Sequence, residues 1–571
     1  MSVVWKERPA DESVIDGFVG RGYSPLQARL LALRGVTADK ADEYFHPSVS
    51  RLASPHELPC VTEAVERMLP FVKDRRKIVV FGDYDCDGVC ATAIMVRVIS
   101  ALGGSVVPFL PERMTEGYGM NDAAVTRMLA EHPDVALVIS VDNGINSVEQ
   151  VAALKEKGIE VIVTDHHLPG DVLPDCVVVN PKVKAPASLS GLCGAGVAFL
   201  LAGALVSAAK ERGLYDGPSV GGPLLVLAGL ATVTDIMPMT GQNRILVAEA
   251  LRRFRKWAPL GLLELYDRSS RTTSAALSVR DFGFLIGPRI NAAGRVASGT
   301  EALNLVLSSD REQAREFARV IDLRNTERKT IEQRMTELAL EQVVPGAPAQ
   351  VINLVHPDAH SGVAGIVASR ILERLPSGES VPVCVIVEGH GSARSPEGYN
   401  VRDAFVASEE ALVRYGGHAA AGGFTVKEGC VDRFRALFCA ACERQVGSLD
   451  AAEKGVEWVD ATVEGSLLTL EFADWLKELE PFGEGNPMPL FVIRNLLLSD
   501  VRPLGAEGRH LQVTFRGEKA PRAVWWGRGD LVEKLRAESS VPYDIAFTVE
   551  ISTFGEPHVE LRLEGIQPSS P

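Results

Sequence analysis

Three short apolar runs in the first half of the chain each end in side chains that can bind a metal ion. Asp83 and Asp85 follow Lys77–Phe81, Asp142 follows Val135–Val141, and the triplet Asp165-His166-His167 follows Glu160–Thr164. In an extended stretch, Asp83 and Asp85 project to the same side. Carboxylate oxygens suit hard cations such as Mg²⁺ and Mn²⁺, and imidazole favours Mn²⁺ of the two. With Asp235, which ends an apolar run from Pro223, these residues predict a divalent metal site.

Each of these residues also has a more ordinary explanation. An aspartate after a strand commonly caps a helix or forms a turn, and for Asp142 or Asp235 alone that explanation is favoured. Two neighbouring histidines alone could lie at the surface. The metal site rests on the coincidence of the three patterns at one sheet edge. Unpaired carboxylates gathered there would repel one another, and bound cations are the natural compensation.

The elements around these residues predict the sheet that would gather them. From Lys77 onward, short runs rich in Val and Ile alternate with helical segments; the expected strands are 77–81, 105–109, 135–141 and 160–164, and the expected helices are 91–102 and 147–157. This alternation is typical of a parallel sheet covered by helices on both faces. Ligands of such sheets bind beyond the carboxyl ends of the strands. The fold class is therefore α/β.

The rest of the chain divides into three further segments. Residues 309–344 are charged, lack Gly and Pro, and place apolar residues at helical spacing, which predicts a long connecting helix. Strands at 351–355 and 381–387 begin a second α/β unit that extends to about residue 446. Five strand-like runs then follow, at 490–493, 510–515, 523–526, 543–551 and 558–563. Closely spaced strands of this kind predict a small barrel or sandwich.

Composition limits the functions that remain open. The 571 residues carry a formal net charge of −15, which argues mildly against a nucleic-acid partner and keeps a small anionic substrate as a rival. The N-terminus has no secretory leader, and no apolar run reaches the ~18 residues of a membrane span, so we expect a cytoplasmic protein without a membrane partner. The nine cysteines are expected to be reduced, and Cys439 and Cys442 to share one helix face rather than bind zinc.

A family resemblance covers nearly the whole chain. The triplet at 165–167, with Gly82–Gly88 upstream, is the signature of the DHH phosphoesterase superfamily. The chain resembles the bacterial RecJ family of single-stranded-DNA-specific exonucleases within it. The supporting stretches are 111–119, 192–197, 287–295, 361–370, 392–395, 416–418 and 481–487.

The resemblance implies a particular division into domains. An N-terminal segment, 1–70, is expected to pack on a DHH domain at 71–305. A connecting helix at 306–345 leads to a DHHA1 domain at 346–446, and an oligonucleotide-binding (OB) barrel follows at 456–571.

The resemblance also assigns roles at the metal site. It implies two divalent cations, Mn²⁺ or Mg²⁺, held by Asp83, Asp85, Asp142, His166, His167 and Asp235, with Asp142 bridging the ions. Asp165 is expected to orient a histidine, and Asp87 to serve the turn. Some superfamily members have an extra histidine before the Asp-x-Asp pair; here that stretch is Ile78–Phe81, so the first ion is expected to be held more weakly or with more open coordination. Two cations ~4 Å apart can stabilise both the attacking and the leaving oxygen of a phosphodiester.

Substrate contacts follow from the resemblance more than from the residues themselves. Arg113, Arg289 and Arg394 are expected to clamp phosphates, Arg289 with a catalytic role, and Ser392, Gly417 and His418 to donate hydrogen bonds to them. Taken alone, the arginines would be surface ion pairs and the Gly-Gly-His stretch a tight turn. In the barrel, Arg502, Arg509, Trp525 and Arg528 are the expected DNA contacts.

The implied activity is processive 5′→3′ hydrolysis of single-stranded DNA to 5′-mononucleotides, in recombination and repair. A single-strand-binding protein and a RecQ-type helicase are the implied partners. Two alternatives remain: a DHH-type phosphodiesterase of short oligonucleotides, which the C-terminal barrel disfavours, and a non-catalytic scaffold for single-stranded DNA, which the filled ligand positions disfavour.

Overall fold

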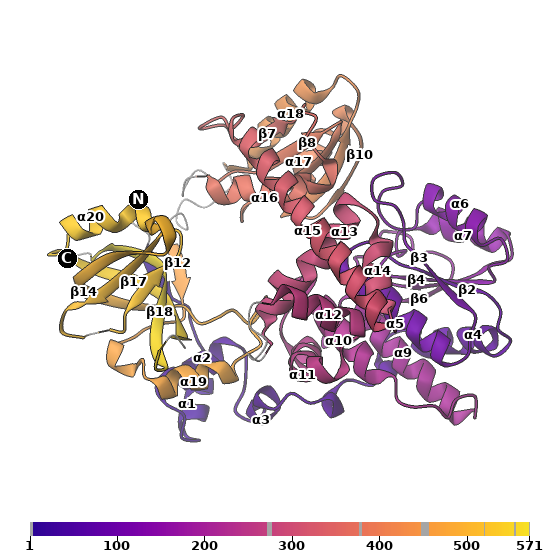
Figure 1. Ribbon diagram of the computed structural model, residues 1–571, viewed down its shortest axis with the longest axis horizontal. Coiled ribbons are helices and arrows are strands. Elements are labelled where there is room, and N and C mark those ends of the chain that lie inside the picture. Colours follow the sequence, from indigo (N-terminus) through magenta and orange to yellow (C-terminus); the bar gives the residue numbers. More distant parts are fainter. Residues whose placement is uncertain are drawn as a thin grey trace. The chain divides into compact units, whose positions relative to one another are not determined.

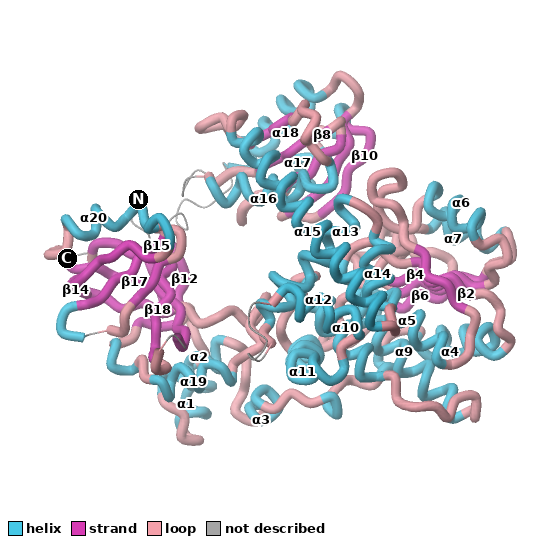
Figure 2. The backbone as a smooth tube through the Cα atoms, viewed as in Figure 1, coloured by secondary structure: helices cyan, strands magenta, loops and turns pink. Residues whose placement is uncertain are grey.

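The computed structural model describes residues 4–270, 277–375, 380–446, 456–518, 520–552 and 555–569. The chain forms two compact units (Figure 1, Figure 2). The first comprises residues 49–237 and 241–451 and is called the catalytic unit here because it contains the residues expected to bind metal. The second, here the barrel unit, comprises residues 1–48, 238–240 and 452–571.

The catalytic unit begins with a five-stranded sheet in the order β3-β2-β4-β5-β6. All neighbouring strands are parallel; they are β2 (Ile78–Phe81), β3 (Val106–Phe109), β4 (Leu137–Val141), β5 (Glu160–Thr164) and β6 (Val177–Val179). The four strands expected from the sequence are confirmed. The fifth, β6, was not foreseen because its three residues are too few to show a pattern.

Helices cover both faces of this sheet. Ile78 and Val80 face one apolar core with α4 (Val61–Lys73), α5 (Cys86–Ala101) and α9 (Gly194–Glu211). Val79 and Phe81 face a second core with α6 (Asp122–Glu131) and α7 (Val148–Glu156). The two-sided burial explains why the strands are apolar throughout rather than alternating. The predicted α/β class is thus confirmed.

Helix α9 is the most apolar long helix of the described chain. By length and composition it is the single described helix that could cross a membrane, and 61% of that window is buried. It packs instead against α5 and α10 (Gly221–Thr234) in the core of the sheet domain. The shorter apolar run from Pro223, which ends before Asp235, forms α10.

The remaining helices lead from the sheet domain to the second α/β domain. They are α8 (Pro181–Lys184), α11 (Gly241–Trp257), α12 (Leu260–Ser269), the π-helix η3 (Asp281–Ile286), α13 (Gly287–Val296), α14 (Gly299–Leu307) and α15 (Arg311–Leu340). Helix α15 spans 30 residues and is capped by Asp310, which accepts a hydrogen bond from the Gln313 amide. The long helix predicted from the charged segment is confirmed.

The second α/β domain contains a five-stranded sheet in the order β10-β11-β9-β8-β7. The strands are β7 (Gln350–Asn353), β8 (Val383–Val387), β9 (His390–Arg394), β10 (Leu412–Gly417) and β11 (Ala421–Val426); the helices are α16 (Ala364–Arg374), α17 (Val401–Val406) and α18 (Val431–Val446). Cys439 and Cys442 lie on α18, with Cys442 buried, as their spacing predicted. All nine cysteines are free thiols.

The barrel unit closes on itself. Strands β14 (Phe491–Leu504), β15 (His510–Phe515), β16 (Ala523–Trp525), β18 (His558–Pro568) and β17 (Pro542–Ser552) follow one another, and β17 pairs back onto β14. A short strand, β13 (Ala461–Thr462), extends β14, and α19 (Leu470–Glu478) and α20 (Val532–Ala537) flank the barrel. The five strands expected from the sequence are confirmed.

Residues 1–48 differ from the expectation that residues 1–70 pack on the DHH domain, whereas residues 49–70 belong to the catalytic unit and the start of α4 lies in its core. Strand β1 (Val4–Glu7) pairs in parallel with β12 (Val456–Val459) in the barrel unit. Helices α1 (Glu12–Val19), α2 (Pro25–Leu33) and α3 (Ala41–Phe45) follow it. Phe18, Leu30 and Leu31 are buried in the same core as barrel residues such as Phe491 and Phe547. Burial of this apolar face decides the location, and it requires contacts between opposite ends of the chain that local patterns cannot reveal.

Candidate metal centre

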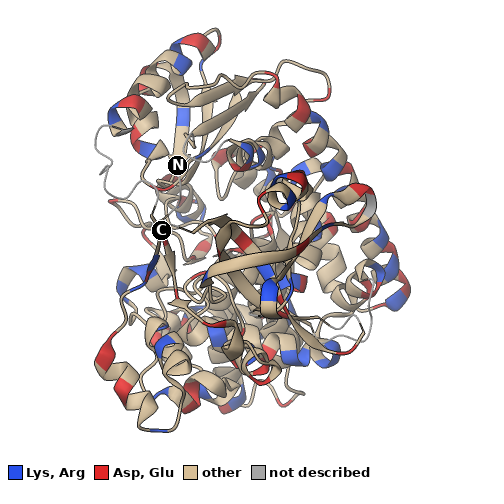
Figure 3. Cartoon of the chain, turned by 90° about the vertical axis from the view of Figure 1, so that its left-hand side faces the viewer, with Lys and Arg blue, Asp and Glu red and all other residues tan. Residues whose placement is uncertain are grey.

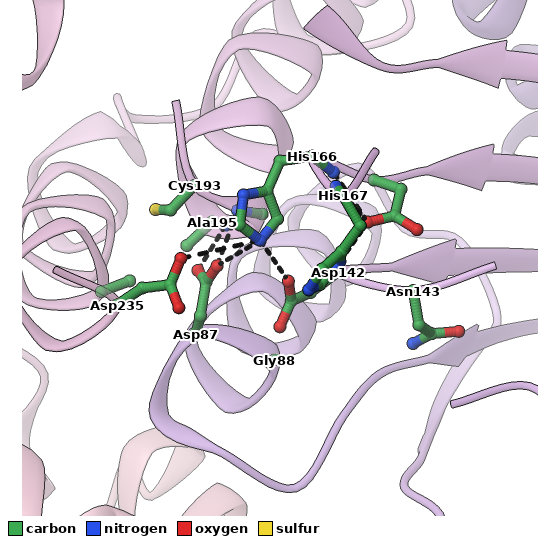
Figure 4. A network of polar contacts seen from close by, with 12 residues as sticks. Asp87, Gly88, Asp142, Asn143, His166, His167, Cys193, Ala195 and Asp235 are labelled. Atoms are coloured by element: carbon green, nitrogen blue, oxygen red, sulfur yellow. Dashed lines mark hydrogen bonds and ion pairs between the residues drawn. The ribbon is translucent and has the colours of Figure 1, made fainter. Parts of the chain in front are cut away.

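The carboxyl ends of β2, β4 and β5 bring the predicted acidic residues and histidines to one edge of the sheet. Asp83, Asp142 and Asp165 are each no more than 2% exposed, and His166 is 5% exposed. Figure 4 shows His166 with its ring directed toward three carboxylates. Its Nε2 lies 3.1 Å from Asp142 Oδ1, 3.6 Å from Asp87 Oδ2 and 3.7 Å from Asp235 Oδ2.

These side chains form three overlapping groups whose ligand atoms lie within 4.8 Å of one another. One group is Asp83, Asp85 and Asp142; the second is Asp142, His166 and His167; the third is Asp87, His166 and Asp235. Asp142 belongs to the first two groups. This is the arrangement that a carboxylate bridging two cations requires. All six positions expected to bind metal therefore meet in one cluster.

Asp87 has a larger part than the turn residue expected from the sequence. Its Oδ2 accepts a hydrogen bond from the Gly194 amide and its Oδ1 one from the Ala195 amide, each at 2.7 Å. The free amides of a helix N-terminus favour a negative charge, and here they belong to α9. Asp87 thus joins the cluster and ties it to α9. The third aspartate of the Asp83–Asp87 run was the sequence signal for this role.

Asp165 holds the histidine pair in place. Its Oδ1 accepts hydrogen bonds from the His166 amide at 2.7 Å, the His167 amide at 3.0 Å and His167 Nδ1 at 2.8 Å. Its Oδ2 accepts one from the Ile145 amide at 3.0 Å. With Nδ1 so engaged, Nε2 of His167 is the ring nitrogen left for a cation.

The electrostatics of the cluster oppose the charges that its residues would carry in water. Burial first, and then neighbouring carboxylates, raise the pKa of Asp83 and Asp142 well above its ordinary value. The same causes raise the pKa of Asp235 to about 8, and burial lowers the pKa of His166 to about 4. Asp83 Oδ1 is buried without a hydrogen-bond partner among the described residues. Hard divalent cations would satisfy this oxygen and neutralise the carboxylates, so the residues fit Mn²⁺ or Mg²⁺.

The backbone around Asp142 has no spare room. Asp142 adopts φ = 61°, in the left-handed region that non-glycine residues rarely occupy. A Cβ on Gly194 would lie 2.6 Å from Asp142 Cβ and 2.7 Å from its Oδ1. The absence of a side chain at Gly194 thus permits α9 to approach the cluster. Strained backbone of this kind is often found at functional sites.

Three arginines lie beside the carboxylate cluster. Burial, followed by repulsion from Arg113 and Arg394, lowers the pKa of Arg295 to about 10. Burial and then Arg113 likewise lower the pKa of Arg394. Guanidinium groups that repel one another in a confined space form a site for an anion such as phosphate. Asp85 partly offsets this lowering of the Arg295 pKa, and the Arg113 guanidinium lies over the ring of Tyr84, the residue between Asp83 and Asp85, with 5.1 Å to the ring centroid.

Arg289 forms an ion pair with the neighbouring helix α15 in this structure. Its Nε donates to Asp322 Oδ1 at 3.0 Å, and its Nη1 donates to the Leu285 carbonyl at 2.8 Å. The contact with Asp322 is the ion pair that the sequence offered as the ordinary explanation of the arginines. The arginine of this stretch that accompanies Arg113 and Arg394 is Arg295, which ends the family-like stretch 287–295 but was assigned no role from the sequence.

A cavity of about 460 Å³ adjoins Arg113. Its lining includes Ser392, Arg414 and Tyr415, and Gly416. Ser392, on β9, pairs with Gly423, which in turn pairs with Gly416 on β10. The next residues, Gly417 and His418, are exposed at the end of β10, and the His418 amide donates to the Ala421 carbonyl at 2.8 Å.

Tyr118 is a further residue that sequence reasoning missed. Its hydroxyl lies 3.3 Å from His167 Nε2 and 3.4 Å from the Asp142 carbonyl oxygen. Its ring meets the imidazole of His167 edge to face at 6.0 Å. Its position between two glycines, in the stretch Gly117-Tyr118-Gly119, was the sequence feature that could have indicated a role at the site.

The expected DNA contacts of the barrel are only partly available. Arg502, Arg509 and Arg528 each pair with a nearby acidic residue, Asp500, Glu507 and Asp530. Trp525 packs against the barrel core, and Arg528 lies over its ring at 4.8 Å. Trp526 is 51% exposed and meets His510 edge to face. Trp526, in the turn that follows β16, is therefore more exposed than the expected Trp525, which is partly buried at the end of the strand.

Three family models match the chain. That of the DHH family, N-terminal domain, matches residues 77–218; the DHHA1 domain matches 348–444; and the RecJ OB domain matches 459–565.

Among characterised proteins, the single-stranded-DNA-specific exonuclease RecJ of Dickeya dadantii is 35% identical over 581 residues, with 95% of this chain and 96% of that protein covered. The RecJ protein of Thermus thermophilus is 36% identical, covering 88% of this chain and 72% of that protein. The Bacillus subtilis protein of the same description is 34% identical; there the match covers 93% of this chain but 66% of that protein.

Solved structures agree with these matches. The crystal structure of Thermus thermophilus RecJ in complex with Mn²⁺ superposes with a TM-score of 0.84 at 31% identity, covering 100% of this chain and 80% of that chain. The corresponding complex with Mg²⁺ gives a TM-score of 0.77 at 30% identity, covering 100% of this chain and 79% of that chain. The similarity therefore extends over all the domains described above.

Proposed function

The chain belongs to the RecJ family, and from this premise we propose that it is a metal-dependent exonuclease that removes nucleotides one at a time from single-stranded DNA. We further propose 5′→3′ polarity, release of 5′-mononucleotides and a role in recombination and repair. The observation that carries the proposal is the buried cluster of carboxylates and imidazoles beside three arginines. Such a pairing supplies what phosphodiester hydrolysis needs: cation ligands and an anchor for the phosphate.

Mn²⁺ or Mg²⁺ are the cofactors that these residues fit. We assign Asp83 and Asp85 to the first cation, His166, His167 and Asp235 to the second, and Asp142 to both. The cations, when bound, supply Lewis-acid stabilisation of the charge that develops on the phosphate oxygens. Asp87 and Asp165 act indirectly: Asp87 fixes the cluster to the amides of α9, and Asp165 holds the tautomer and orientation of His167.

The arginines position the substrate in this proposal. Arg113 and Arg394, together with Arg295, whose charge both of them oppose, bind a phosphate near the cluster. Ser392, Gly417 and His418 donate hydrogen bonds to the terminal or an adjacent phosphate. Arg289, assigned a catalytic part from the family resemblance, would have to leave Asp322 to reach substrate. Arg295, whose Nη1 donates to the Gly362 carbonyl at 3.3 Å, is a further candidate for a phosphate ligand.

End-labelled DNA tests the activity and its polarity together. We expect a 5′-label to be released as a mononucleotide from single-stranded DNA with Mn²⁺ or Mg²⁺, with no release in EDTA and little from blunt duplex. Asp142→Ala should abolish release while the protein keeps its melting profile without metal. Asp171→Ala, an exposed aspartate in a loop, is the matched control. Unchanged turnover in Asp142→Ala would contradict the two-cation proposal. Release of a 3′-label before a 5′-label would show that the polarity is 3′→5′ instead.

Partners and location follow from the proposed substrate. Single-stranded DNA in a cell is coated and exposed by other proteins, so we propose a single-strand-binding protein and a RecQ-type helicase as partners, and the cytoplasm as the place of action. The two proposed partners can be tested by adding each purified protein to the exonuclease assay and comparing nucleotide release with that in the presence of an unrelated DNA-binding protein.

A further inference from the structure

The barrel unit contains a groove that the proposed chemistry does not use. It has a volume of about 1170 Å³ and is lined by residues of α2, β13 and α19 together with the segments beside them. All of its lining residues lie in the barrel unit. Its size exceeds that of a typical small-molecule pocket, which favours a stretch of polypeptide or another polymer as occupant.

The floor of the groove is apolar and partly aromatic. Leu26 and Val463 line it together with Phe472 and Trp475, whose stacked rings have centroids 6.1 Å apart and an interplanar angle of 19°. Phe472 also contacts the buried Phe491 edge to face, which anchors the pair to the barrel core. Leu467, which lines the groove, is 51% exposed. A large apolar side chain held in solvent beside an aromatic floor is typical of a binding surface.

The rim of the groove is acidic. Glu471, Asp474 and Glu478 recur at helical spacing on α19, and Glu7 lies on β1. Asp474 Oδ1 also pairs with Lys477 Nζ on the same helix at 2.9 Å, an exposed pair that a cationic segment would exchange. Among the described lining residues, Arg29 is the single cation. Its charge is already engaged: Nε donates to the Asp460 carbonyl at 2.7 Å, and Nη2 lies 3.3 Å from Glu7 Oε2. Figure 3 shows acidic and basic positions interspersed along the helices, whereas the lining of the groove has four carboxylates against one guanidinium.

We propose that this groove docks a segment of a partner protein in which lysine or arginine residues flank bulky apolar side chains. The apolar side chains would pack on Leu467, Phe472 and Trp475, and the cations would pair with the carboxylates of α19. The same carboxylates repel single-stranded DNA and acidic peptides.

Synthetic peptides of opposite charge test the proposal on the full-length protein. The probe is a fluorescein-labelled dodecapeptide with lysines around leucine and phenylalanine at helical spacing, and its twin has glutamate at every lysine position. Fluorescence anisotropy should show saturable binding of the lysine peptide alone, weakening by about tenfold or more in 0.5 M salt. The double variant Glu471→Lys/Asp474→Lys should lose this binding, and Leu467→Ser should weaken it. Glu533→Lys, an exposed reversal on α20, should keep it.

The alternatives give different results. Equal binding of the two peptides, or full binding of the lysine peptide to the double variant, would overturn the proposal. Displacement of the peptide by a non-cleavable single-stranded oligonucleotide would assign the groove to DNA instead. Circular dichroism and thermal melting of the double variant report whether the barrel unit, to which both substituted residues belong, is folded. The salt dependence on the unaltered protein keeps the test decisive if that variant does not fold.

Discussion

At the scale of single residues, the candidate metal centre combines features that cost folding energy. Asp83 and Asp142 are buried with raised pKa values, and Asp142 has a left-handed backbone. Groups of this kind persist where the surrounding structure enforces them and function benefits. Gly194 is part of that enforcement, since its missing side chain admits Asp142 and its amide holds Asp87.

Gly194→Ala should therefore disable the centre without unfolding the protein. The new Cβ would meet Asp142 at 2.6–2.8 Å, so Asp142 or the start of α9 must shift. Displacements of ~1 Å at a catalytic group can reduce the rate about a hundredfold, and we expect a loss of kcat of that order. Gly203→Ala, on the same helix with its nearest neighbour at 3.8 Å, is the control and should remain active. Equal activity of the two variants would show that the approach of α9 to Asp142 is unimportant.

Stability of the metal-free protein should fall as pH rises, and metal should reverse this. Burial, with neighbouring carboxylates, raises the pKa of Asp235 to about 8, above its ordinary value of 3.8. A carboxyl group with a raised folded pKa contributes stability that is complete below the unfolded value and is lost as pH rises toward 8. Cations replace the protons, so the increase in Tm on adding Mn²⁺ should grow from pH 6 to pH 8.5.

Thermal melting with Mn²⁺ or with EDTA measures this dependence. The Asp235→Asn variant, which lacks the titrating group, should show a flatter pH dependence in EDTA. A rise in Tm with Mn²⁺ that is as large at pH 6 as at pH 8.5 would contradict the expectation.

At the scale of elements, local patterns predicted most of the fold. The four strands β2 to β5 show uninterrupted apolar runs, and helix α15 shows helical spacing, so each of these patterns can be recognised from the element's own residues. The three-residue strand β6 is too short to show such a pattern, and the β1–β12 pair joins segments that are distant in the sequence, so neither could be predicted locally. Similarly, Asp83, Asp142 and the histidines could be predicted from their positions after strands. Arg289 and Arg295 share helix α13, and sequence does not say which faces the cluster and which faces Asp322 on α15.

The packing of helix α15 against α16 should depend on a buried ion pair. Glu332, 9% exposed, pairs with Arg328 on the same helix and with Arg370 on α16. Glu332→Ala leaves the buried Arg328 guanidinium without its carboxylate, and loss of one partner of a buried pair costs about 3–5 kcal/mol. Calorimetry should show a lower unfolding temperature for the catalytic unit, and hydrogen exchange should show faster exchange in α15 and α16.

Glu337→Ala provides a matched comparison on the same helix. Its pair with Arg334 is about half exposed on both sides, so we expect a change of less than about 1 kcal/mol. Equal destabilisation by the two substitutions would mean that helix propensity, rather than the junction, governs the effect.

At the scale of the whole molecule, the two ends of the chain build one unit. Residues 1–48 and 452–571 share a core to which α1 and α2 contribute Phe18, Leu30 and Leu31. The catalytic unit has separate apolar cores around its own sheets. Truncations should therefore follow the units rather than the linear order of the domains.

Removal of residues 452–571 alone should give an insoluble protein, because it exposes the apolar side chains of α1 and α2 to solvent. Removal of residues 1–48 as well should restore solubility.

The remaining protein, residues 49–451, keeps the carboxylate cluster and the arginines, so it should still cleave short oligonucleotides with Mn²⁺. It loses the barrel that would hold a longer strand, so its KM for long single-stranded DNA should rise more than its KM for a trinucleotide. Expression, gel filtration and paired kinetics on the two substrates measure these outcomes. A soluble 1–451 protein would disprove the shared core, and equal losses on both substrates would remove the barrel from substrate binding.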